Sequence, residues 1–310
     1  MQTYYLSPYH YDENVQMQVA QNKKPKEIEV RANESAIIRA LTRYRVLNKK
    51  AITDAVNKML PGPRQKPNFD KEVSILFEGG YLKKYHYKDA KNGRGNIVAF
   101  TLTEKGIQYA KDKQMRFNYK PLRDTQRYST AAILEYLTLN LWHLRILNCY
   151  TDSIHGENYQ LITRIQDDKN TIIPSCITLE NEEWTLLKRF SIAAIPYIKT
   201  NEEEAKGVFL NTLLSVNAFF NLNKKVHRLS FIIILVDSFQ QMEEASRMIY
   251  SFMPLRKLQV YYAVDEFVND EDPLRWIYEV DRSTDIKNSV KYDLIDFTQK
   301  IPEEKKEGAE

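Results

Sequence analysis

Residues 34–113 carry the feature that most constrains the fold: three segments with helical hydrophobic periodicity precede two short segments in which apolar and polar residues alternate. Apolar residues that recur every three or four positions predict amphipathic helices, and alternation predicts half-buried strands. The alternating segments flank Asn92 and Gly93, which tolerate the positive φ of a tight turn. The order therefore predicts three helices and a β-hairpin that share one core.

The ends of the three helices are indicated by residues that favour helix caps and stops. The first helix is predicted to begin at Glu34, with Asn33 as its N-cap. The second follows Asn48 and ends at Leu60, ahead of a Pro-Gly-Pro run. The third is predicted over 69–78 and stops at a Gly-Gly pair. On this third helix the predicted buried residues are Phe69, Val73, Leu76 and Phe77, and the predicted exposed residues are Lys71, Glu72, Ser74 and Ile75.

A fourth helix, predicted from Thr103 to about Lys113, completes a winged helix-turn-helix. Residues 76–82 read Leu-Phe-Glu-Gly-Gly-Tyr-Leu, a basic hairpin follows, and residues 102–106 read Leu-Thr-Glu-Lys-Gly. This succession resembles the end of MarR-like winged helices. More narrowly, it resembles the replication-relaxation family of bacterial plasmids and mobile elements, in which such a module precedes a nuclease-like α/β domain.

The two parts of the chain carry opposite net charges. Residues 1–128 hold 25 Lys or Arg and 13 Asp or Glu, a net of +12, whereas residues 129–310 hold 20 Lys or Arg and 28 Asp or Glu, a net of −8. A basic region of domain size is typical of a protein that approaches a polyanion, most often nucleic acid. The alternative is a lysine-rich surface that is only solvated.

The winged helix-turn-helix indicates which side chains would contact DNA. The second helix of the motif lies in the major groove, where Arg and Lys pair with guanine and Gln and Asn pair with adenine. The tip of the wing suits contacts to phosphate or to the minor groove. The candidate DNA-binding residues are Arg64, Gln65, Lys66, Asn68, Lys71 and Ser74 at the third helix, and Lys88, Lys91, Asn92, Arg94 and Asn96 in the wing.

The second half of the chain predicts a long helix, three strands, a helix, a strand, a helix and a last strand. The order helix, three strands, helix, strand is that of the restriction-endonuclease-like fold, and it fits the second domain of the family named above. The predicted strands cover 159–165, 171–179, 184–198, 229–236 and 258–264, and the predicted helices cover 129–150, 201–220 and 240–252.

The predicted fold class is therefore α+β, with an N-terminal winged helix-turn-helix followed by an α/β restriction-endonuclease-like domain. The predicted division of the chain is a flexible arm (1–32), a winged helix-turn-helix DNA-binding domain (33–113), a linker (114–128), the α/β nuclease-like domain (129–300) and a disordered tail (301–310).

The nuclease-like fold holds Mg²⁺ through an Asp on its second strand and acidic residues on its third, because Mg²⁺ prefers hard oxygen ligands. The resemblance places Ser175 at the first of these positions and Ala193 and Ile195 at the others. No carboxylate occurs between Glu183 and Glu202. We therefore expect a scaffold that lacks active-site carboxylates, with no catalytic residue, no metal and no cofactor.

These features predict a sequence-preferring double-stranded DNA-binding protein of a bacterial plasmid, phage or conjugative element, acting in transcription regulation or in replication and relaxation. The C-terminal domain is expected to form a homodimer or to bind a replication, transfer or transcription protein. The sequence has Cys149 and Cys176 as its two cysteines, and its longest uninterrupted apolar run is 231–236. A cytoplasmic location, associated with a plasmid or the nucleoid and not with a membrane, is expected. Two alternatives stay open: a Mg²⁺-dependent nuclease with relocated carboxylates such as Asp281 or Glu202, and a winged helix that serves only protein assembly.

Overall fold

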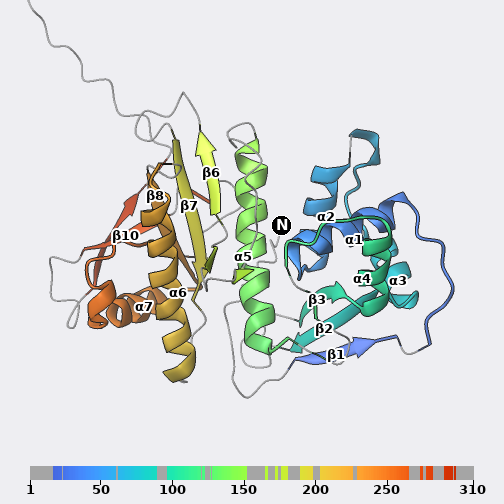
Figure 1. Cartoon of the computed structure of the whole chain (residues 1–310), viewed down its shortest axis with the longest axis horizontal. Coiled ribbons are helices and arrows are strands. Elements are labelled where there is room, and N and C mark those ends of the chain that lie inside the picture. The colour runs from blue at the N-terminus through green and yellow to red at the C-terminus, as the bar shows by residue number, and fades with distance from the viewer. Residues whose placement is uncertain are drawn as a thin grey trace, which may run out of the picture.

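The protein is a mixed α+β structure in which one long helix, α5 (Thr130–Cys149), lies between two groups of elements (Figure 1). We call β1–β3 with α1–α4 the N-terminal module, and the six-stranded sheet with α6 and α7 the C-terminal module. The computed structural model describes residues 17–22, 24–60, 62–88, 96–119, 121–122, 126, 128–151, 165–166, 172–173, 176–180, 189–197, 203–225, 229–264, 273–274, 277–281, 290–295 and 297.

Four helices form the core of the N-terminal module: α1 (Ala32–Tyr44), α2 (Lys49–Met59), α3 (Asp70–Glu78) and α4 (Glu104–Asp112). All four were predicted. Asn48 and Thr103 cap α2 and α4, because their side-chain oxygens accept hydrogen bonds from the backbone N–H groups three residues ahead, at 2.8 and 3.2 Å. The Asn33 N-cap prediction is wrong. The N-cap of α1 is Arg31, and Asn33 lies inside the first turn, where its side chain bonds to Glu72 instead.

A small antiparallel sheet packs beside these helices. The predicted hairpin is confirmed: β2 (Leu82–Lys88) pairs with β3 (Asn96–Leu102) over seven residue pairs. On the outer edge of β2 lies β1 (Gln18–Gln21), so this part of the predicted flexible arm is a paired strand. On the edge of β3, Leu47 exchanges two backbone hydrogen bonds with Phe100, at 3.2 and 2.8 Å. The chain between α1 and α2 is thereby joined to the sheet.

The described part of the predicted linker packs against α1. The Tyr119 hydroxyl is buried and donates to the Leu41 carbonyl at 2.9 Å, and the Asn118 N–H donates to the Thr42 carbonyl at 3.1 Å. The Tyr119 ring also lies 4.6 Å from the guanidinium of Arg45, which follows α1 with a positive φ of 61°. Arg45 further donates to the hydroxyl of Tyr136 on α5. These contacts fix the chain that leads from α4 to α5.

The C-terminal module is built on a mixed six-stranded sheet with the order β11-β10-β9-β8-β7-β6. The pairs β7·β8 and β8·β9 are parallel, and the remaining pairs are antiparallel. The strands are β6 (Cys176–Glu180), β7 (Arg189–Pro196), β8 (Ser230–Val236), β9 (Tyr261–Val264), β10 (Ile277–Asp281) and β11 (Lys291–Ile295), and the helices are α6 (Glu203–Leu222) and α7 (Phe239–Ser251).

Two differences from the predicted strands have local causes. The strand expected over 171–179 is divided into β5 (Ile172–Ile173), which pairs with β4 (Ile165–Gln166), and β6 in the large sheet. The sequence places Pro174 between them, and proline cannot donate to a strand ladder. The strands β10 and β11 were not predicted, because each is only five residues long and is stabilised mainly by pairing with neighbouring strands.

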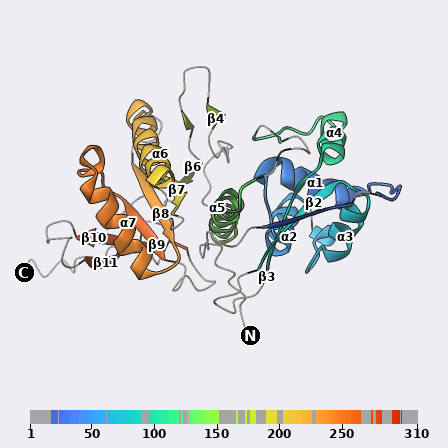
Figure 2. The ribbon, with the colours of Figure 1, turned by 90° about the horizontal axis from the view of Figure 1, so that it is seen from below.

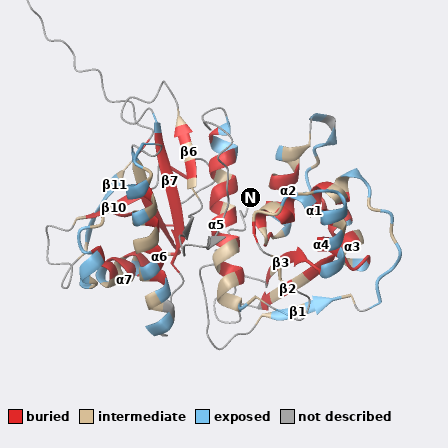
Figure 3. Ribbon diagram, in the orientation of Figure 1, coloured by how far each residue is buried: buried red, intermediate tan, exposed pale blue. Residues whose placement is uncertain are grey.

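Helices cover both faces of this sheet (Figure 2). Side chains of α6 and α7, such as Phe209 and Met242, pack on one face. On the other face Trp142 and Ile146 of α5 pack against residues of β7 and β8. Buried and half-buried residues follow one another along most of α5, which lies between the two modules (Figure 3).

The N-terminal module is also packed on α5. Leu144 and Leu147 belong to the hydrophobic core of α1–α4, and Ile133, Leu134 and Leu137 pack against the hairpin. The predicted nuclease-like domain begins at residue 129, but its first helix buries side chains in the N-terminal module as well. Among the described helices, none combines the length and the apolar character needed to cross a membrane.

Candidate nucleic-acid interface

The loop that leads into α3 is held in place by α2. A short 3-10 turn (Gly62–Arg64) follows α2. The Asn57 side chain then donates to the Lys66 carbonyl at 2.8 Å and accepts from the Lys66 N–H at 3.0 Å. The Gln65 side chain donates to the Asn57 carbonyl at 3.1 Å. These three hydrogen bonds set the position of residues 65–68 relative to the helix before them.

The burial of one side of α3 determines which residues face outward. Phe69, Val73 and Leu76 are buried against the helical core, as predicted, and Phe77 is half-buried. The helix ends at Glu78, and Gly80 beyond its C-cap has a φ of +76°, in the region that favours glycine. The candidate residues that the structure places at exposed positions are Arg64, Gln65, Asn68, Lys71 and Ser74.

Two predictions for α3 are wrong. Glu72 was expected to be exposed, but it is buried and forms an ion pair with Lys66. Burial favours the neutral form of Glu72, yet its hydrogen bonds, above all the one from Lys66, hold the pKa of this carboxyl below its ordinary value. Ile75 is half-buried. The carboxylate of Glu72 therefore compensates the charge of Lys66, one of the candidate DNA-binding residues.

The other two acidic residues of α3 are also paired with cations. Asp70 lies 3.1 Å from Lys49 of α2, and Glu78 lies 2.8 Å from Lys26. In contrast, Arg64 and Lys71 form no ion pair with any described residue. The exposed N-terminal end of α3 therefore presents two cationic side chains whose charges are not matched by nearby carboxylates in this part of the structure.

Both faces of the hairpin are covered by other elements. Leu82 and Phe100 belong to the helical core, whereas Tyr85 and Tyr87 pack toward α5. Lys88 and Asn96 pair at the outer end of the two strands. The wing candidates Lys91, Asn92 and Arg94 lie outside the described residues.

In the C-terminal module the two described positions that were expected to bind metal in a nuclease are buried. Ala193 and Ile195 of β7 pack against α6 and α7, and Ser175 lies outside the described residues. Burial also raises the pKa of the neighbouring Cys176 thiol to about 12. No group of three or more His, Cys, Asp or Glu among the described residues is arranged to hold a metal ion.

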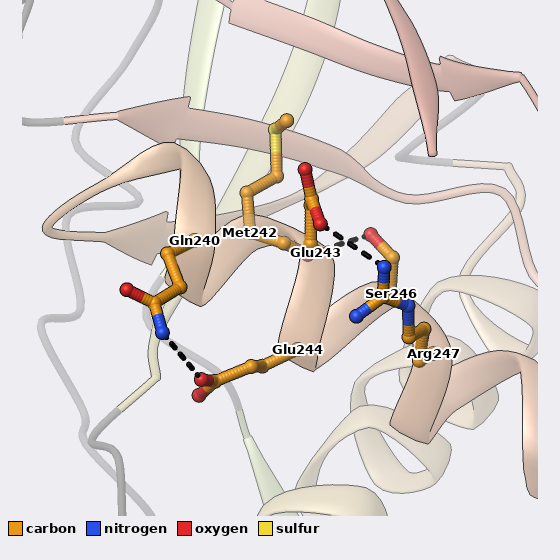
Figure 4. A network of polar contacts seen from close by, with 6 residues as sticks. All are labelled: Gln240, Met242, Glu243, Glu244, Ser246 and Arg247. Atoms are coloured by element: carbon orange, nitrogen blue, oxygen red, sulfur yellow. Dashed lines mark hydrogen bonds and ion pairs between the residues drawn. The ribbon is translucent and has the colours of Figure 1, made fainter. Parts of the chain in front are cut away.

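Of the two carboxylates considered for a relocated site, only Asp281 is among the described residues. Asp281 ends β10, and Glu202 lies outside the described residues. The acidic residues of α7 are used within the helix: Glu243 pairs with Arg247 at 3.1 Å, and Glu244 accepts from Gln240 at 3.4 Å (Figure 4). Such pairs stabilise a helix surface and do not form a ligand set.

A second group of basic residues was not predicted from the sequence. Arg39 and Arg43 on α1 lie around one groove with Lys113 and Arg116 after α4. The spacing of Arg39 and Arg43 was a usable signal, because residues four apart share one side of a helix. The other two residues are more than sixty positions away in the chain, and only the folded structure brings them to α1. No protein-family model, no curated protein and no solved structure matches this chain.

Proposed function

We propose that residues 33–113 form a winged helix-turn-helix that binds double-stranded DNA with α3 in the major groove. The element order supports this reading: α1, the Leu47 bridge, α2, α3 and the hairpin follow one another, and α4 closes the core. The exposed N-terminal end of α3 supports the function most directly, because Arg64, Asn68 and Lys71 are side chains that read base edges or contact phosphate.

The charge of the chain supports a polyanionic partner. Residues 1–128 carry a net +12, and the acidic residues of α3 are paired with cations of the same module. Those pairs limit the repulsion that unmatched carboxylates on α3 would exert on DNA phosphates. The resemblance to the replication-relaxation family is consistent with this function and suggests a role in transcription regulation or in replication and relaxation.

We further propose that the C-terminal module is not catalytic and provides contacts to a second copy of the chain or to a partner protein. Its core positions Ala193 and Ile195 are apolar and covered by helices. Its edge strand β11 exposes Tyr292 by 38% and Leu294 by 52%. An exposed strand edge with large apolar side chains favours pairing with another chain.

Binding of random-sequence duplex DNA by the full chain tests the role of α3. The variant Arg64→Gln/Lys71→Gln is expected to bind at least about tenfold more weakly, because each lost contact costs about 1–3 kcal/mol. Fluorescence anisotropy at several salt concentrations measures the effect. The matched control is Lys224→Gln/Lys225→Gln, which removes two exposed charges after α6 and is expected to bind like the wild type. Equal affinities for all three proteins would exclude α3 as the DNA contact.

A further inference from the structure

The N-terminal module has an open groove of about 720 Å³ between α1, the end of α2 and the segment after α4. Four of its nine lining residues are cationic: Arg39 and Arg43 come from α1, and Lys113 and Arg116 come from the end of α4 and the segment beyond it. None of the lining residues that the structure describes is acidic. The candidate residues at α3 do not line it, so it is a separate feature of the module.

The folded chain after α4 brings the two pairs of cations together. Gln114 has a positive φ of 53°, which is unusual for a residue other than glycine. Beyond it the Met115 N–H donates to the Ala110 carbonyl at 2.8 Å, and the Asn118 N–H donates to the Thr42 carbonyl at 3.1 Å. The backbone thus reverses over the end of α4 and places residues 113–116 beside α1.

This arrangement has an electrostatic cost that an anion would remove. Like charges that line one groove repel each other, and none of the described lining residues is acidic. Arg39 and Arg116 are exposed and form no ion pair with any described residue. The positive φ of Gln114 belongs to the C-terminal cap of α4, and the chain beyond this cap passes beside α1.

We propose that this groove binds phosphoryl groups. A guanidinium presents parallel N–H donors that match two oxygens of one phosphate, and a lysine ammonium adds a mobile point charge. The three arginines and Lys113 suit a ligand with several linked phosphates, and Asn118 adds a neutral polar residue to the lining. Two sources share this chemistry, the backbone of a nucleic acid and a free polyphosphate, and the test below separates them.

Titration of the full chain with inorganic tripolyphosphate, followed by calorimetry, tests the groove. Wild type is expected to bind, and Arg39→Gln/Arg116→Gln is expected to bind at least about tenfold more weakly, because two charge-assisted contacts are lost. Both side chains are exposed, so the variant keeps the core intact. The matched control Lys224→Gln/Lys225→Gln also removes two exposed charges and is expected to keep wild-type affinity for tripolyphosphate.

Duplex DNA binding by the same variants identifies the source of the phosphate. If the groove holds a nucleic-acid backbone, the Arg39→Gln/Arg116→Gln variant lowers the dependence of log affinity on log salt by about two, and tripolyphosphate competes with DNA. If the groove holds a free polyphosphate, this variant loses tripolyphosphate binding and keeps its affinity for DNA. Either result supports the proposal. Failure of wild type to bind tripolyphosphate, or equal binding by the Arg39→Gln/Arg116→Gln variant, overturns it, whatever the outcome for α3.

Discussion

His143 is a buried side chain of α5 whose ionisation is coupled to folding. It is 2% exposed, and its ring lies edge-on to Tyr44 with the centroids 6.0 Å apart. Burial, together with the nearby charge of Arg43, lowers the pKa of His143 to about 3. An unfolded histidine has a pKa of about 6.5, so between these two values the unfolded chain binds the proton and the folded chain does not.

The stability of the protein is therefore expected to fall as the pH decreases from about 6.5 toward 3. The contribution of one such histidine has a limiting slope of about 1.4 kcal/mol per pH unit. His143→Gln removes the titrating group, so the free energy of unfolding should depend less on pH, by up to about 2 kcal/mol between pH 7 and pH 5. Urea unfolding at the two pH values measures this difference. The same pH dependence in wild type and variant would contradict the account of His143.

At the scale of single elements, one buried amide joins α5 to the N-terminal module. The Asn140 side chain is 2% exposed and donates to the carbonyl oxygens of Tyr44 and Val46, at 2.6 and 2.7 Å. These carbonyls lie where the chain turns from α1 toward α2, and a buried carbonyl without a donor is costly. Asn140 therefore fixes the position of α5 against α1.

Replacing Asn140 with Asp keeps the shape of the side chain and removes both donors. Asn140→Asp is expected to lower the free energy of unfolding by about 2–4 kcal/mol. The Val46 carbonyl loses its Asn140 donor, the Tyr44 carbonyl keeps the Val46 N–H as a donor, and a carboxylate is placed beside both oxygens. Asn148→Asp is the matched control on the exposed side of the same helix and should change the stability by less than about 0.5 kcal/mol. Equal unfolding midpoints in urea for the two variants would show that the amide does not hold α5.

Elements with local signals were predictable from the sequence. The helices α2 and α4 were located by their caps Asn48 and Thr103, and the hairpin by its alternation and turn. The strands β1, β10 and β11 were not located, because their main stabilisation is pairing with strands formed elsewhere in the chain. Local periodicity does not report such pairing.

The candidate site was predictable to a smaller extent. The exposed position of Lys71 follows from the amphipathic pattern of α3, and those of Arg64 and Asn68 follow from the polar segment before it. The pairing of Lys66 with Glu72 did not follow, because it depends on the side-chain contact between them and on Asn33 of α1. The basic groove combines residues of α1 with residues after α4, so its charge could not be assigned to one surface before the fold was known.

For the whole molecule, α5 determines how the two modules are related. Its side chains belong to the core of α1–α4, pack against the hairpin, and cover the face of the mixed sheet opposite α6 and α7. A basic module and an acidic module are thereby held together by one helix and not only by a connecting chain. The net charges of +12 and −8 thus belong to parts of the chain that are packed on a shared element.

Selection of bound sequences from a random duplex pool, followed by hydroxyl-radical footprinting, tests the proposed DNA-binding function most directly. Sequence-preferring binding through α3 predicts an enriched sequence that the full chain protects as a discrete footprint. It also predicts that Arg64→Gln/Lys71→Gln loses this footprint while Lys224→Gln/Lys225→Gln retains it. Absence of enrichment, or a footprint that is unchanged in the α3 variant, would contradict sequence-preferring recognition through α3.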